Sequence, residues 1–86
     1  MVSFEPGFDV TSRGVSFIAR VEGHLVGCSV SAAALAEKES VAAADTTALR
    51  KIFKRHEKLI RDQMARKIAQ GVAEPDRTFC LHSGEF

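Results

Sequence analysis

Two stretches of alternating hydrophobic and polar residues flank the pair Glu22-Gly23. A period of two is typical of strands, and a two-residue turn containing glycine is typical of a hairpin. We therefore predict a hairpin over residues 14–31 in which Val21 faces His24. In this register the face directed at the core is apolar at nearly every position, with Val15, Phe17, Ala19, Val21, Val26, Cys28 and Val30.

The opposite face of the predicted hairpin is mostly polar, with two exceptions. Ile18 and Leu25 lie there as diagonal neighbours, and only Arg20 and Ser29 accompany them as polar cover. Large apolar side chains on an outward face, together with the open edges of a small sheet, are features of interaction surfaces. Ile18 and Leu25 are therefore the candidate residues for a protein interface.

The period changes from two to 3.6 after the hairpin. Ser31 is a suitable N-cap for a short helix over residues 32–40, whose inward side carries Leu35. Asp45 or Thr46 caps a long amphipathic helix over residues 45–71, and Gly71 is a suitable residue to end it. At 100° per residue, one arc of this helix collects Leu49, Ile52, Phe53, His56, Leu59, Ile60 and Met64.

These elements predict a single α+β domain over residues 1–86. Residues 1–13 form an irregular lead-in, and residues 78–83 form a third strand with Phe79 and Leu81 on one side. The order β-β-α-α-β gives a small antiparallel three-stranded sheet with two helices on one face. The predicted core consists of Val15, Phe17, Ala19, Val26, Cys28, Val30, Leu35, Leu49, Ile52, Phe53, Ile60, Met64, Phe79 and Leu81.

The hairpin and helix residues resemble those of a known family. The pattern comprises Val15-x-Phe17-x-Ala19-x-Val21-Glu22-Gly23, Val26-x-Cys28-x-Val30-Ser31, Ala34-Leu35, then Phe53, Ile60, Ala65, Ile68, Gly71 and the closing stretch from Asp76 to Phe86. It is similar to the short proteobacterial proteins grouped as domain of unknown function family 1488. The resemblance implies a compact β-β-α-α-β domain of the bacterial cytoplasm, and it brings no activity, cofactor or catalytic residue with it.

Composition agrees with a small folded domain. The 86 residues are 45% hydrophobic and 27% charged, which excludes both a disordered chain and a membrane-spanning one. The N-terminal residues carry neither a basic region nor an apolar run typical of a secretory signal. Two cysteines in such a chain favour a reducing compartment, so we expect a cytoplasmic protein that has no disulfide and does not contact a membrane.

Positive charge is concentrated on the predicted long helix. Residues 50–67 carry a net charge of +6, whereas the rest of the chain carries −5. A nucleic-acid or acidic-partner surface on this helix would use Arg50, Lys51, Lys54, Arg55, Lys58 and Arg61. Against nucleic acid, Glu57 and Asp62 precede Arg61 and Arg66 by four residues, and no aromatic residue is interleaved for base stacking. A solvated face is the favoured interpretation.

The residues that carry chemistry elsewhere do not form a recognisable site. His24 and Cys28 are four residues apart on one strand, about 13 Å, which is too far to share a zinc ion with Cys80 and His82. His56 has no nucleophile or orienting acid nearby on its helix, and no glycine-rich phosphate loop is present. The sequence therefore favours a protein that is not an enzyme and binds no metal or cofactor. We predict a small binding or adaptor protein that contacts a protein partner or itself, with weak nucleic-acid binding through the basic helix as the alternative.

Overall fold

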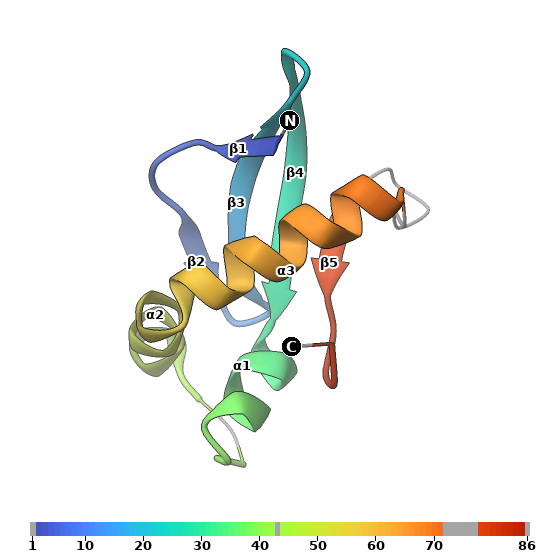
Figure 1. Cartoon of the computed structure of the whole chain (residues 1–86). Helices are drawn as coiled ribbons and strands as arrows, with labels where there is room; N and C mark the ends of the chain where they lie inside the picture. The colour runs from blue at the N-terminus through green and yellow to red at the C-terminus, as the bar shows by residue number, and fades with distance from the viewer. Residues whose placement is uncertain (1, 43, 72–77, 86) are drawn as a thin grey trace.

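A mixed five-stranded sheet with three helices forms the domain (Figure 1), and the computed structural model describes residues 2–42, 44–71 and 78–85. The strands are β1 (Val2–Phe4), β2 (Asp9–Thr11), β3 (Gly14–Val21), β4 (His24–Ser31) and β5 (Phe79–Leu81). The helices are α1 (Ala32–Lys38), α2 (Thr46–Arg55) and α3 (Glu57–Gln70). Asp76 and Phe86, which bound the last stretch of the family resemblance, lie outside the described residues.

The β3–β4 hairpin has the predicted register. Val21 pairs with His24, Phe17 with Cys28 and Val15 with Val30. The turn residues Glu22 and Gly23 both have positive φ, 50° and 84°, as a two-residue hairpin of this hand requires. The prediction of the hairpin is confirmed, and its apolar face is the one that the helices cover.

The prediction of an irregular lead-in is wrong, because residues 2–11 contain two strands. β1 and β2 both pair antiparallel with β3 along the edge that β4 leaves open. Pro6 and the positive φ of Gly7 (91°) divide the lead-in into two strands of three residues each. An eight-residue strand with an unpaired edge offers many backbone groups, which explains why even short segments pair with it.

The antiparallel three-stranded sheet is also corrected, since β5 pairs parallel with β4. The three helices lie between these strands in the chain, and β5 runs alongside the second half of β4 (Figure 1). Parallel strands need a long connection of this kind. β5 corresponds to the third strand predicted over residues 78–83. It is shorter than predicted, and it pairs with Cys28, Ser29 and Val30 of β4.

The predicted helix over residues 45–71 is two helices, with His56 at the joint between α2 and α3. His56 leaves helical geometry (φ −111°, ψ 16°), and its N–H is shared between the carbonyls of Ile52 and Phe53. The two helices run in clearly different directions (Figure 1). The caps agree with the sequence: Ser31 and Asp45 accept hydrogen bonds at the starts of α1 and α2, and Gly71 ends α3 in the left-handed conformation.

The core lies between the sheet and the helices. All the predicted core residues are buried except Val26 and Phe79, which are partly buried against it. Its centre is a row of aromatic rings in which Phe17 lies 5.8 Å from Phe4 and 5.6 Å from Phe53, and Phe8 lies 4.6 Å from Phe53. These contacts fix β1, the β1–β2 connection and α2 onto the hairpin.

Candidate functional site

The face of the sheet directed away from the helices is the first candidate surface. Ile18 and Leu25, the predicted interface residues, are both exposed there, with 41% and 63% of their surface accessible. Between them Arg20 donates a hydrogen bond of 2.6 Å to Glu5. The structure therefore presents both apolar side chains on one surface, as the register predicted.

Leu25 also has backbone groups directed toward an open edge. The Ile18 carbonyl accepts a hydrogen bond of 2.9 Å from the Glu5 N–H, so Ile18 directs its polar groups away from β4. Because the direction repeats every second residue in an antiparallel pair, Arg20 and its partner Leu25 also point outward from the hairpin. In the described part of the chain, β5 reaches only from Cys28 to Val30, which leaves Leu25 without a ladder partner on that side.

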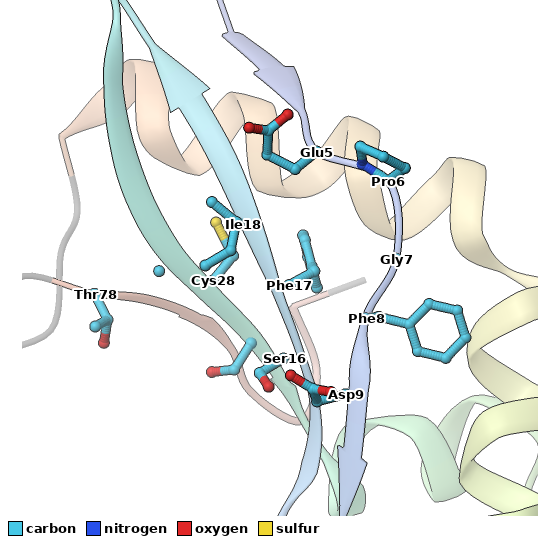
Figure 2. Close-up of a pocket in the computed structure, with 12 residues that line it drawn as sticks. Glu5, Pro6, Gly7, Phe8, Asp9, Ser16, Phe17, Ile18, Cys28 and Thr78 are labelled. Carbon is cyan, nitrogen blue, oxygen red and sulfur yellow. The ribbon is translucent and has the colours of Figure 1, made fainter.

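The same face contains two adjacent hollows. The larger, about 380 Å³, extends from the β1–β2 connection across β3 to Gly27 and Thr78 (Figure 2). The smaller, about 310 Å³, is lined by Thr11, Arg13, Ser31 and Cys80 among others, and it shares Ser16 and Ser29 with the first. Sequence reasoning missed both hollows, because it did not place β1 and β2 beside the hairpin.

The predicted basic surface on residues 50–61 is not a uniform row of free cations. Arg61 is largely buried, with its guanidinium 5.2 Å from the centroid of the Phe4 ring and 2.7 Å from the Glu57 carboxylate. Arg50 lies over the Phe8 ring at 5.5 Å, and Arg55 forms an ion pair with Glu39. Three of the six candidate residues thus have intramolecular partners.

The other three candidates are exposed lysines. Lys51, Lys54 and Lys58 make no ion pair within the described residues. The joint at His56 separates them, since Lys51 and Lys54 lie on α2 and Lys58 lies on α3. The bend between the two helices means that these lysines do not continue as one straight stripe.

His56 connects the joint between α2 and α3 to the end of α1. Its Nε2 lies 2.8 Å from Oε2 of Glu39, whose other carboxylate oxygen accepts from Arg55. The hydrogen bond from His56 and the charge of Arg55 lower the pKa of the Glu39 carboxyl. His56 therefore has a structural partner, and no nucleophile accompanies it among the contacts of the described residues.

The two cysteines lie on opposite faces of the sheet, as predicted. Cys28 is in the core, where burial raises the pKa of its thiol to about 11. Cys80 is half-buried and lines the smaller hollow on the outer face. Among the described residues, no three histidine, cysteine or acidic side chains come together as metal ligands.

Thiol modification of the native protein should therefore occur at Cys80 first. The thiolate is the reactive form, and Cys28 is both protonated at neutral pH and covered by the core. We expect Cys28 to react only when the domain opens, which can be followed by mass spectrometry of samples quenched during labelling. Cys80→Ser should leave only the slow reaction and Cys28→Ser only the fast one; equal rates in the two variants would contradict the assignment of faces.

Lys67 is a buried cation. From the sequence alone, it counted only as part of the net charge of residues 50–67. Its ammonium donates to both carboxylate oxygens of Glu85, at 2.8 and 3.0 Å, and to the carbonyl of Cys80. Oε1 of Glu85 also accepts from the His82 N–H at 2.6 Å. The helical period could have indicated this position, because Lys67 follows the core residue Ile60 by seven residues, two full turns.

The Lys67–Glu85 pair should make stability depend on acid. The hydrogen bonds from Lys67 and then from the His82 N–H lower the pKa of Glu85 in the folded state. Its contribution is therefore complete above the unfolded pKa, about 4.3, and is lost as the pH falls through the lower folded value. We expect Glu85→Gln to cost about 1 kcal/mol at pH 7, a modest figure because the carboxylate is partly solvated.

Urea unfolding of the wild type and of Glu85→Gln at several pH values between 2 and 7 tests this expectation. The difference between the two proteins should begin to shrink below about pH 4, where the carboxylate of the unfolded wild type becomes protonated, and should vanish below the lower pKa of the folded state. Glu37→Gln, on an exposed position of α1, is the matched control and should behave as the wild type throughout. A pH-independent difference for Glu85→Gln would contradict a stabilising ion pair.

Fold and surfaces together describe a small α+β domain in which none of the three described helices covers the outer face of the sheet. Residues 2–81 match the family described as "Protein of unknown function (DUF1488)", and the chain belongs to this family. The structure is similar to the crystal structure of a protein of unknown function from the same family, from Shewanella loihica PV-4. The TM-score is 0.83 at 15% identity, over 95% of this chain and 92% of that chain.

The structural likeness shows the fold alone, because the two chains share so few residues. No curated protein matches the sequence. None of the helices in the described ranges is both long and apolar enough to cross a membrane. Membership of the family therefore confirms the resemblance found in the sequence and leaves the function to be inferred from the surfaces.

Proposed function

We propose that the protein is a non-enzymatic binding module that holds an extended peptide segment of a partner protein against β4. The observation that carries the proposal is Leu25, whose side chain is 63% exposed and whose backbone groups have no ladder partner on the β5 side among the described residues. A peptide that adds as a strand gains main-chain hydrogen bonds from such an edge and side-chain contacts from the face beside it. Ile18 on the neighbouring strand extends the apolar contact.

The placement of the thiols and of His56 within the described residues supports a binding role rather than catalysis. In the described ranges, Cys28 is covered by the core and His56 is engaged by Glu39 on the helical side. Cys80 is the thiol on the outer face, and the atoms near its sulfur are a carbonyl oxygen and the His82 ring at 3.9 Å. The 3.9 Å between Cys80 Sγ and His82 Nδ1 is longer than the nucleophile–base hydrogen bond that covalent catalysis uses.

A peptide display library selected against the immobilised domain tests the proposal. We expect enrichment of extended peptides with alternating apolar residues, and fluorescence polarisation of the selected peptides should give saturable binding. The double variant Ile18→Thr with Leu25→Ser should weaken that binding by about tenfold or more, the value of one buried leucine side chain. Val41→Ser is the matched control, because Val41 is similarly exposed (44%) but lies after α1.

Three results would argue against the peptide. Selection that yields no saturable peptide, or binding that tolerates the double variant, would remove the β4 edge as the binding surface. Sedimentation that shows a dimer abolished by Leu25→Ser would instead assign the surface to a second copy of the chain. Self-association through open strand edges follows from the same backbone groups.

Weak nucleic-acid binding through the exposed lysines is the second candidate. It is favoured by the three cations Lys51, Lys54 and Lys58, which have no ion-pair partner among the described residues. We expect at most non-specific binding, with Kd no tighter than about 10⁻⁶ M near physiological salt. Fluorescence anisotropy with labelled RNA and DNA at low and high salt measures it, and replacement of the three lysines by glutamine should reduce it. Submicromolar, sequence-dependent binding that this variant loses would put nucleic acid first.

A further inference from the structure

The larger hollow on the outer face arises from a mismatch between the edge strands and β3. Phe4 pairs with Ala19 and Asp9 pairs with Ser16, so residues 5–8 are opposite only Phe17 and Ile18. The connection therefore bulges away from the sheet, and the Phe8 ring turns toward α2, where it meets Phe53 (Figure 2). The hollow is a consequence of two extra residues in the edge chain.

Gly27 deepens the hollow on the other side of Ile18. It pairs with Ile18 across the hairpin and has no side chain to fill the face, and a Cβ at this position would have Thr78 Cγ2 as its nearest neighbour at 3.4 Å. The space of about 380 Å³ lies at the lower end of the range of ligand sites. The sheet thus forms the base of the hollow, and the lack of a side chain at Gly27 makes the hollow deeper at that position.

The lining combines a carboxylate, hydroxyl groups and an apolar wall. Glu5 lies at one end of the hollow, and Asp9 and Ser16 lie at the other, with Ile18 between them (Figure 2). Arg20 neutralises Glu5 through its hydrogen bond of 2.6 Å. Asp9 makes no ion pair within the described residues, so it leaves the hollow with a net negative charge beside the hydroxyls of Ser16 and Ser29.

We propose that this hollow binds an alkylammonium group, carried either by a lysine side chain or by a free primary amine. An ammonium ion donates up to three hydrogen bonds, and the Asp9 carboxylate and the serine hydroxyls are acceptors for them. The methylene chain behind the ammonium packs on Ile18 and Pro6, as lysine stems do on apolar surfaces. The Asp9 carboxylate would repel an anionic ligand, so the charge of the hollow favours a cation.

The hollow and the peptide-binding surface share Ile18, but Asp9 lines only the hollow and Leu25 lies only at the strand edge. Asp9 and the β1–β2 connection lie on the far side of β3 from the open edge at Leu25. Asp9→Asn therefore tests the hollow alone, whereas Leu25→Ser by itself tests the strand edge alone.

NMR titration of the ¹⁵N-labelled protein tests the alkylammonium site. The probes are 1,5-diaminopentane and the peptide acetyl-Ala-Lys-Ala-amide, with acetyl-Ala-norleucine-Ala-amide as the uncharged control. We expect saturable shifts of the backbone amides of Asp9, Ser16, Gly27 and Ser29 with a charged probe, and none with the norleucine peptide. Saturation by the diamine alone assigns the site to a free amine, and tighter binding of the lysine peptide assigns it to a protein side chain.

Two variants and a control complete the experiment. Asp9→Asn should weaken binding about tenfold, the value of one charge-assisted hydrogen bond, whereas Asp62→Asn on the exposed surface of α3 should leave it unchanged. Gly27→Val should abolish binding by filling the hollow, and its well-dispersed spectrum will show that the fold is intact. No saturable shift with either amine, or equal affinity in wild type and Asp9→Asn, would overturn the proposal.

Discussion

Phe17→Ala should destabilise the domain by about 3–5 kcal/mol, the usual cost of deleting a buried aromatic side chain. Phe17 is 3% exposed and lies between the rings of Phe4 and Phe53, with the Arg61 guanidinium 5.8 Å from its centroid. Its removal would therefore loosen β1, α2 and α3 together. For a domain of 86 residues such a loss is a large share of the total stability, and part of the protein should be unfolded at 25 °C.

Urea unfolding followed by circular dichroism measures this effect. Leu25→Ala is the matched control, since Leu25 lies on the paired strand but faces solvent, and its replacement should change stability by less than about 0.5 kcal/mol. Comparable losses of stability for the two variants would contradict the structure, in which Phe17 lies on the buried face of the hairpin and Leu25 on the exposed face. The comparison tests burial rather than hydrophobicity, because both residues are large and apolar.

The hairpin and the core were predictable because a local signal determines each of them. The pair Glu22-Gly23 fixes the register of β3 on β4, and the register then places Phe17 and Cys28 on the core face. The helix caps Ser31 and Asp45 are equally local, since each bonds an N–H three residues further along the chain. A single sequence is therefore sufficient to predict the hairpin register and the helix caps.

The edge strands and the direction of β5 were not predictable in the same way. Each of these strands has three residues, which is too short for a period of two to be distinguished from a loop. Their conformation comes from pairing with β3 or β4, and the partners of β5 lie 51 residues away in the chain (Cys28 and Phe79, for example). Pairing with distant strands, and not the local sequence pattern, therefore determines the conformation of these three strands.

The helix joint at His56 has a similar cause. No proline or glycine marks it, and the polar His56 within an apolar arc was the sign that the arc is not continuous. Glu39, at the end of α1, holds the imidazole and so fixes the bend. The same bend changes the candidate surface, because Arg61 is carried onto the Phe4 ring instead of into solvent.

Gly14 shows how a single backbone position joins the sheet to the helices. It begins β3 with φ +145°, a conformation that side chains other than hydrogen rarely adopt. It also lies against the chain where β4 leads into α1: a Cβ built there would be 2.1 Å from the Val30 carbonyl oxygen and 2.9 Å from the Ala32 nitrogen. Since both neighbours are backbone atoms, no side-chain rotation can relieve the contact.

Gly14→Ala should therefore destabilise the domain by about 3 kcal/mol or more, because strain in φ adds to displacement of the β4–α1 junction. That junction carries the Ser31 cap and the hydrogen bond from the Ala32 N–H to the Arg13 carbonyl, 2.8 Å, both of which depend on its position. Gly7→Ala is the matched control: Gly7 also has positive φ, +91°, but its Cβ would meet nothing within 4 Å, so only about 1 kcal/mol should be lost. Urea unfolding of both variants separates the cost of backbone strain, which both variants have, from the cost of the steric clash, which only Gly14→Ala has. Equal losses would show that the β4–α1 junction yields freely, and would remove Gly14 as the residue that fixes α1 against the sheet.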